Sequence, residues 1–176
     1  MNTKLVAISV LTLIAGYGVF ELYKYYMKME NDKFLINFIK GKEGFREDPY
    51  LDSANVPTIG YGFTYYADGR PVKMSDPAMK RSTADKMFLE ILEPFKEGME
   101  KAVKVKQNPK QMAALISMAY NNGVEAIRTS TLMTVINSGG TGQEIRDQFR
   151  RWVYAGGKYI PGLANRREKE ILIYFS

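Results

Sequence analysis

The sequence contains neither cysteine nor histidine. Without cysteine there can be no disulfide, no thiol nucleophile and no thiolate ligand for a metal. Without histidine there can be no histidine-based zinc site and no Ser-His-Asp or Cys-His arrangement. If the chain is an enzyme, its acid-base chemistry therefore falls to carboxylates, lysine or tyrosine. We expect neither a metal nor a cofactor in its site.

Internal repeats and low-complexity linkers are also missing from the 176 residues, which fit one domain or two small lobes. The net charge of +6 and the pI of about 9.3 favour a polyanionic partner, although solubility alone would also explain them. Nucleic acid, anionic lipid and an acidic polymer such as the bacterial cell wall all fit. Apart from two arginine pairs, the basic residues are scattered and match no nucleic-acid motif, so we expect no nucleic-acid partner.

A long hydrophobic run is missing as well. The longest uncharged apolar stretch, Leu5 to Phe20, has 16 residues, whereas a membrane-spanning helix needs about 20. It fits a cleavable secretory signal, a short anchor, a marginal membrane segment that can insert and later leave, or a buried core helix. One lysine, Lys4, precedes the stretch, and Lys24, Lys28 and Lys33 follow it, so the positive-inside rule favours, if anything, the wrong orientation for export.

The first third of the remaining chain predicts one helix followed by short strands. Asn31 or Asp32 can cap a helix that ends at Gly44, which places Glu43 in its last turn. Four β-prone pieces separated by turn residues follow, at residues 49–52, 57–61, 63–66 and 70–73.

From Ser75 onward the pattern is helical. Caps are predicted at Ser82 or Thr83, at Asn108 and at Thr129 or Ser130, and further helices at residues 143–153 and 163–175. The sequence thus predicts an α+β fold with a small β-containing lobe, a long connecting helix and a helical lobe. A cleft between the lobes would suit a long ligand.

The stretch from Lys42 to Gly62 combines two acids and a hydroxyl in the pattern E-x8-D-x5-T, formed by Glu43, Asp52 and Thr58. A carboxyl group at a helix C-terminus faces the negative end of the helix dipole, which favours its protonated form and suits a general acid. Asp52, in a polar turn, should stay ionised and could hold a water together with Thr58. An acid on one side of a bond and a carboxylate with a water on the other are the machinery of glycoside hydrolysis.

These three residues have the spacing found at the active site of the phage-type lysozymes, the glycoside hydrolase family of T4-like endolysins. The resemblance continues through "PTIGYG", "SMAYNNG" at Ser117 to Gly123 and "RRWVYAGGKYIPGLANRREKE" at Arg150 to Glu170. It covers the chain from about Phe34 to its end, in several blocks in the correct order. The implied fold is the lysozyme fold, with its active-site cleft between the two lobes.

The resemblance implies a muramidase that cleaves the β-1,4 bond between N-acetylmuramic acid and N-acetylglucosamine in peptidoglycan, with inversion. Glu43 would be the general acid, Asp52 would orient or activate the water, and Thr58 would also bind that water. Arg166 stands where the family has an arginine near the acid, and we expect it to pair with Glu43. Tyr61 could line the sugar cleft or belong to the core, and Asn121 could bind the saccharide or cap a helix.

The N-terminal stretch resembles the signal-anchor-release segments of some of these endolysins. This resemblance implies an export segment at residues 1–24 and a lysozyme domain at 25–176, with lobes at about 32–74 and 75–176. The enzyme, a monomer, would be tethered inactive in the host inner membrane through residues 5–20 and then released, active, into the periplasm. A cysteine switch, used by some relatives, is impossible here. We expect instead that the tether holds the helix of Glu43 out of register with the hairpin.

Two other functions compete. A lytic transglycosylase cleaves the same bond with one acid and no water, and the presence of Asp52 and Thr58 argues against it. A membrane-tethered, basic wall-binding protein without enzymatic activity is the alternative from another class. Substituting Glu43 by Gln separates an enzyme from such a binder.

Overall fold

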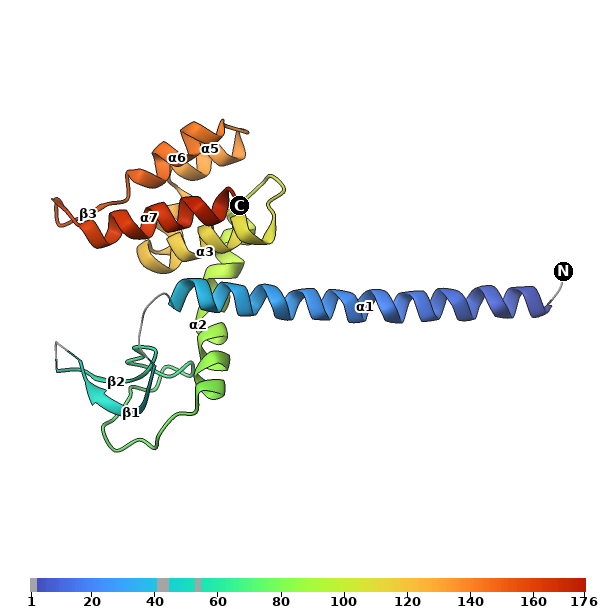
Figure 1. Cartoon of the computed structure of the whole chain (residues 1–176), viewed down its shortest axis with the longest axis horizontal. Coiled ribbons are helices and arrows are strands. Elements are labelled where there is room, and N and C mark those ends of the chain that lie inside the picture. Colours follow the sequence, from blue (N-terminus) through green and yellow to red (C-terminus); the bar gives the residue numbers. More distant parts are fainter. Residues whose placement is uncertain (1–2, 41–44, 53–54) are drawn as a thin grey trace. The chain divides into compact units, whose positions relative to one another are not determined.

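The computed structural model describes residues 3–40, 45–52 and 55–176 (Figure 1). It divides into two units, the first ending at Asn37 and the second beginning at Phe38. The second unit contains all the strands and every helix after the first. The predicted export boundary after residue 24 concerns processing of the chain and stays a prediction.

A single helix, α1 (Thr3–Lys40), forms the first unit and enters the second with its last residues. The predicted helix start at Asn31 or Asp32 is therefore wrong. No glycine or proline interrupts the chain between Phe20 and Lys40, so nothing forces a break there. Exposed ion pairs between residues one turn apart, such as Lys24 with Glu21 at 3.0 Å, stabilise the helix modestly. Among the described residues, no helix combines the length and the apolar character needed to cross a membrane.

The predicted hairpin is present. Strands β1 (Arg46–Leu51) and β2 (Pro57–Gly60) pair in antiparallel fashion, with Tyr50 opposite Thr58 and Leu51 opposite Pro57. The later β-prone pieces form only two isolated bridges, Ile59 with Phe63 and Tyr65 with Pro71. The predicted β-containing lobe is thus one hairpin followed by irregular chain.

The helical part consists of α2 (Arg81–Ala102), α3 (Pro109–Asn122), α4 (Val124–Arg128), α5 (Thr131–Asn137), α6 (Gly142–Arg150) and α7 (Pro161–Tyr174). It contains the predicted helices in the predicted order, together with one short helix, α4, that was not predicted. Asn108 caps α3 as predicted, in a capping box with Gln111, and Ser130 caps α5. The predicted cap of α2 is wrong, because that helix begins one residue before Ser82 and Lys80 at its N-cap makes no side-chain cap.

A second hairpin was not predicted. Strands β3 (Tyr154–Ala155) and β4 (Lys158–Tyr159) pair across Gly156 and Gly157, which have positive φ angles of 55° and 75°. Two consecutive left-handed residues form the two-residue turn that favours a hairpin, and only glycine adopts it without strain.

Helix α3 lies at the centre of the helical part and packs against α2, α4 and α7 (Figure 1). Every residue of α3 from Ala113 to Ala119 is buried. Aromatic rings continue from this core toward the first hairpin: Tyr120 contacts Phe88 of α2 at 5.8 Å between ring centroids, and Phe88 contacts Phe63 at 5.8 Å. Helix α2 therefore connects the hairpin to the helical core, and the predicted α+β fold class is confirmed.

Candidate active site

The side chains of Asp52 and Thr58 both bond the backbone of Val56 at the turn of the first hairpin. The backbone N–H of Val56 donates to Asp52 Oδ1 at 2.9 Å, and the Thr58 hydroxyl donates to the carbonyl oxygen of Val56 at 2.9 Å. Two backbone hydrogen bonds, from Asp52 N–H to Val56 O and from Asn55 N–H to Asp52 O, both 3.0 Å long, close the same turn. Both predicted water-binding side chains are thus fixed to the backbone of one residue.

The hydrogen bond of Thr58 determines what its hydroxyl can offer to a ligand. Its proton is used on the Val56 carbonyl, so the lone pairs of its oxygen are the groups that face any additional partner. Thr58 is only 2% exposed, which suits contact with one ordered water rather than with bulk solvent. Glu43 lies outside the described residues, and so does its predicted place in the last helical turn.

The chain on either side of Glu43 is anchored to Tyr61. The Lys40 ammonium donates to the Tyr61 hydroxyl at 2.8 Å and lies 3.9 Å from the centroid of its ring. The Phe45 ring lies 5.1 Å from the same ring. Tyr61 is 4% exposed, so of the two roles considered for it, a core position is the one its burial supports.

Asp85 of α2 completes a polar cluster with Lys40 and Tyr61, which we call the clasp. Lys40 forms a short ion pair with Asp85, and the Tyr61 hydroxyl donates to Asp85 Oδ1 at 2.9 Å. Partial burial disfavours the charged carboxylate, but the hydrogen bonds from Lys40 and Tyr61 outweigh it, so the pKa of Asp85 lies below its ordinary value. The clasp joins the end of α1, the residue after β2 and the first turns of α2.

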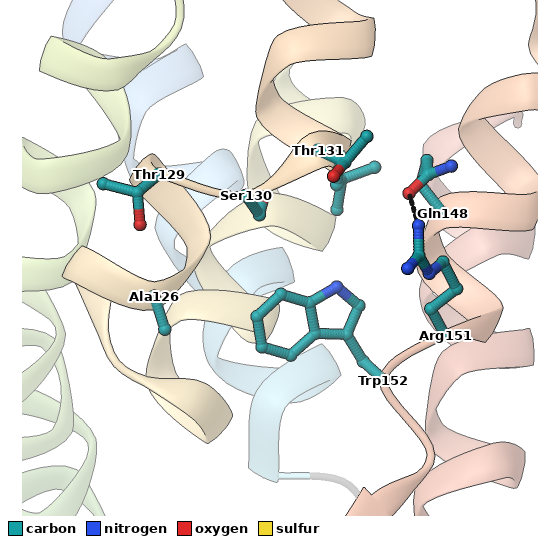
Figure 2. A pocket seen from close by; sticks show the side chains of 8 residues that line it. Ala126, Thr129, Ser130, Thr131, Gln148, Arg151 and Trp152 are labelled. Carbon is teal, nitrogen blue, oxygen red and sulfur yellow. Dashed lines mark hydrogen bonds between the residues drawn. The ribbon is translucent and has the colours of Figure 1, made fainter.

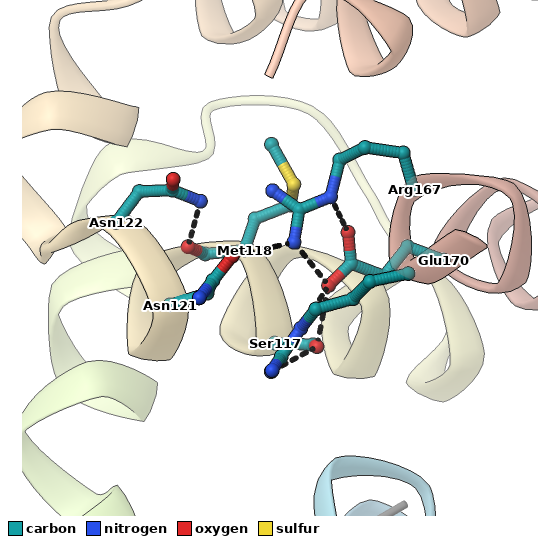
Figure 3. Close-up of polar contacts among 7 residues, drawn as sticks. Ser117, Met118, Asn121, Asn122, Arg167 and Glu170 are labelled. Carbon is teal, nitrogen blue, oxygen red and sulfur yellow. Dashed lines mark hydrogen bonds and ion pairs between the residues drawn. The ribbon is translucent and has the colours of Figure 1, made fainter. Parts of the chain in front are cut away.

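A second ionic cluster lies between α3 and α7 (Figure 3). Arg167 and Glu170 are both 0% exposed, and Arg167 Nε lies 2.7 Å from Glu170 Oε2. Glu170 Oε1 also accepts from the Ser117 hydroxyl at 2.6 Å, and Arg167 Nη2 donates to Asn121 Oδ1 at 2.8 Å. Burial raises the pKa of the Glu170 carboxyl and lowers that of the Arg167 guanidinium, and their attraction opposes both shifts.

Arg166 joins this cluster from its edge. It donates to Glu170 Oε1 through Nε and to the Ser117 hydroxyl through Nη2, both at 3.2 Å. Its predicted pairing with Glu43 involves a residue outside the described ones and stays a prediction. Asn121, considered for saccharide binding, uses its amide oxygen on Arg167.

Sequence reasoning missed Glu170 and Arg167 as members of one cluster. The available pattern was the spacing of Glu170, which stands three residues after Arg167 and four after Arg166, so that all three side chains can meet on one face of a helix. The partner on α3, Ser117, is 53 residues away in the chain, and no local pattern relates the two.

A pocket of about 410 Å³ opens elsewhere in the helical part, beside the indole ring of Trp152 (Figure 2). Its lining combines this aromatic face with hydroxyl, amide and guanidinium groups from Thr129, Thr131, Gln148 and Arg151. Such a lining suits a polar ligand with one flat face. The described residues include no group of three or more acidic side chains placed to hold a metal ion.

Comparison with known proteins decides the family. The family model for phage lysozyme matches residues 40–170, which is most of the chain. The chain belongs to the phage lysozyme family. The match includes the first hairpin, the clasp and both arginines of the α3–α7 cluster.

Curated relatives in this family are phage proteins. The chain is 34% identical over 143 residues to an endolysin of Bacillus phage B103, with 80% of this chain and 52% of that protein covered. It is 38% identical over 133 residues to a SAR-endolysin of Bacteriophage PS119, with 74% of each covered. The matched part thus spans about half the length of the Bacillus phage endolysins B103 and PZA and three quarters of the PS119 protein.

Solved structures support the same fold. An endolysin from Escherichia coli O157:H7 phage FAHEc1 superposes with a TM-score of 0.71 at 34% identity, covering 81% of this chain and 90% of that one. A point mutant of P22 lysozyme superposes with a TM-score of 0.69 at 30% identity, covering 81% of this chain and 95% of that one. The predicted lysozyme-like fold is therefore confirmed.

Proposed function

We propose that this phage lysozyme family member is an endolysin muramidase. It hydrolyses the β-1,4 bond between N-acetylmuramic acid and N-acetylglucosamine in bacterial peptidoglycan and so lyses the host cell. The observation that carries the proposal is the hairpin turn, in which Asp52 and Thr58 are both held by hydrogen bonds to Val56. The net charge of +6 suits an acidic wall polymer as substrate.

In the proposed mechanism, Glu43 is the general acid and gives its proton to the glycosidic oxygen. A water held by Asp52 and Thr58 attacks the anomeric carbon from the opposite face, and the carboxylate of Asp52 accepts a proton from it. The new carbon–oxygen bond forms as the glycosidic bond breaks, so the product has inverted configuration. A carboxylate has several lone-pair sites, so an oxygen that accepts the Val56 N–H can also accept from water.

The hydroxyl orientation of Thr58 supports its part in this mechanism. Because its proton points to the Val56 carbonyl, its oxygen can accept a hydrogen bond from the water and turn a water lone pair toward the sugar. Arg166, which already bonds Ser117 and Glu170, would use its remaining N–H groups to orient Glu43.

The names of several relatives support a proposal for location. SAR-endolysins of Bacteriophage PS119 and Escherichia phage Mu are 38% and 37% identical to this chain. We propose that residues 5–20 export the protein and tether it, inactive, in the host inner membrane. Release would yield an active monomer in the periplasm. Residues 5–20 belong to the same helix, α1 (Thr3–Lys40), that ends three residues before Glu43 in the sequence. We propose that release of the segment from the membrane acts on the acid through this helix.

The test is a muropeptide digest with the full-length chain and its Glu43→Gln variant on purified peptidoglycan, with product ends identified by mass. We expect reducing muramic acid ends from the wild type. We expect none from Glu43→Gln, because glutamine cannot deliver a proton to the leaving oxygen.

The other outcomes identify the rival functions. Products lighter by one water would indicate a lytic transglycosylase and would contradict the roles of Asp52 and Thr58. Binding to peptidoglycan without cleavage by either protein would favour a wall-binding protein. Thermal unfolding of both proteins serves as the control, since a folded Glu43→Gln variant is needed for its inactivity to be informative.

A further inference from the structure

The clasp connects three elements through one ammonium group. Lys40 at the end of α1 donates to Asp85 of α2 and to the hydroxyl of Tyr61, which directly follows β2. The Lys40 side chain is 12% exposed, and its Nζ lies against the Tyr61 ring as well. A lysine engaged by a carboxylate, a hydroxyl and a ring face has lost most of its usual freedom of movement.

Contacts with Tyr61 of the clasp are made on both sides of the segment that carries Glu43. Lys40 precedes residues 41–44 and Phe45 follows them, and both contact the ring of Tyr61. The Phe45 ring is also contacted by the Arg81 guanidinium, which lies 4.5 Å from its centroid. The chain therefore enters and leaves this segment at the same aromatic ring.

We infer that Lys40, Tyr61 and Asp85 are positioning residues, which hold the backbone carrying Glu43 in register with Asp52 and Thr58. The inference rests on the proposed function, in which Glu43 is the acid. Tyr61 follows the strand that carries Thr58, so the bond from Lys40 to Tyr61 ties the segment of the acid to the strand of the water site. None of the three residues touches the substrate in this account.

The magnitude of the effect follows from the geometry of catalysis. An acid displaced by about 1 Å can lower a rate by about a hundredfold, because proton transfer depends steeply on distance and angle. A partly exposed ion pair, in contrast, contributes little to stability. The side chain of Asp85 is 40% exposed. If the clasp served stability alone, substitutions in it would therefore change both the free energy of unfolding and kcat only slightly.

The experiment measures kcat and KM on purified peptidoglycan for full-length Lys40→Met, at a temperature where the variant is folded. We expect kcat to fall about tenfold or more and KM to stay within about twofold, because binding groups are intact and only the acid is misplaced. Lys40→Arg, which keeps the charge and the donors, should recover most of the activity. Tyr61→Phe, which keeps the ring and removes only the hydroxyl, should lie between Lys40→Met and the wild type.

The matched control is Lys101→Met. It makes the same chemical change at an ordinary exposed ion pair, that of Lys101 with Glu97 at 3.2 Å. We expect wild-type kcat and KM. Glu43→Gln is measured beside it, as the reference for the proposed function.

The outcomes separate the two claims. Full kcat in both Lys40→Met and Tyr61→Phe, with Glu43→Gln inactive, would overturn the positioning role and leave the proposed function standing. An active Glu43→Gln variant would overturn the proposed function, and the positioning role with it. If Lys40→Met does not fold, Tyr61→Phe decides: reduced kcat at unchanged KM supports the role, and wild-type kcat contradicts it.

Discussion

Two ionic clusters in the second unit differ in their exposure to water. Arg167 and Glu170 between α3 and α7 are completely buried, whereas the clasp is partly open at Asp85. In the dry cluster, each charge depends on its partner, because removing one leaves the other buried and unpaired. In the clasp, water reaches the Asp85 carboxylate and can replace a partner lost from it. Ionic and polar groups therefore stabilise the fold in the Arg167–Glu170 cluster, whereas in the clasp they position the backbone that carries Glu43.

The largest effect that would test this contrast is expected from Arg167→Met. It removes the charge that lies 2.7 Å from Glu170 Oε2 and leaves Asn121 without its donor. We expect the free energy of unfolding to fall by about 3 kcal/mol, at the low end for a broken buried pair because Arg166 still donates to Glu170. Denaturant unfolding at constant m-value measures it. A loss below about 0.5 kcal/mol, typical of a surface site, would contradict the contrast.

A smaller effect is expected when both partners are replaced, in Arg167→Met with Glu170→Leu. Two apolar side chains of similar size leave no buried charge from this pair, which often restores stability. We expect the double variant to lose about 1–3 kcal/mol less unfolding free energy than the two single variants lose in sum. Unfolding of all four proteins in a double-mutant cycle gives this value, and simple additivity would show that the two groups do not interact.

The smallest stability effect is expected from Asp85→Asn in the clasp, below about 1 kcal/mol at neutral pH. The pKa of Asp85 is lowered in the folded protein, so its contribution is fully present above the ordinary value of 3.8 and is lost as the pH falls through the lower folded value. The difference in unfolding free energy between wild type and Asp85→Asn should thus shrink below about pH 4. A difference that grows toward acid pH would have the wrong sign.

The first hairpin and the caps of α3 and α5 could be predicted because their determinants are local. Asn108 precedes a proline and Ser130 precedes an apolar run. Each side chain accepts a hydrogen bond from a backbone N–H only three residues further along the chain. The pair predicted to bind the water, Asp52 and Thr58, is local in the same way, since both side chains bond the backbone of Val56 between them.

The remaining parts depend on contacts between distant segments. Nothing around Arg166 and Arg167 tells which of the two is buried, because that is decided by α3, which supplies Ser117 and Asn121 as partners. Lys40 and Asp85 are 45 residues apart in the chain, beyond the reach of any local pattern. Asn31 and Asp32 can cap a helix and so predict a start there, but no helix breaker interrupts the chain between Phe20 and Lys40, and α1 continues through both residues.

The most direct test of the account measures unfolding free energy and kcat on the same preparations of Arg167→Lys and Asp85→Asn. Arg167→Lys keeps the charge but loses the fork of donors shared between Glu170 and Asn121. We expect Arg167→Lys to lose mainly stability and to keep its kcat while folded. We expect Asp85→Asn to keep its stability and to lose several-fold in kcat. The reverse pattern, or equal effects in both proteins, would contradict the division between a stabilising cluster and a positioning clasp.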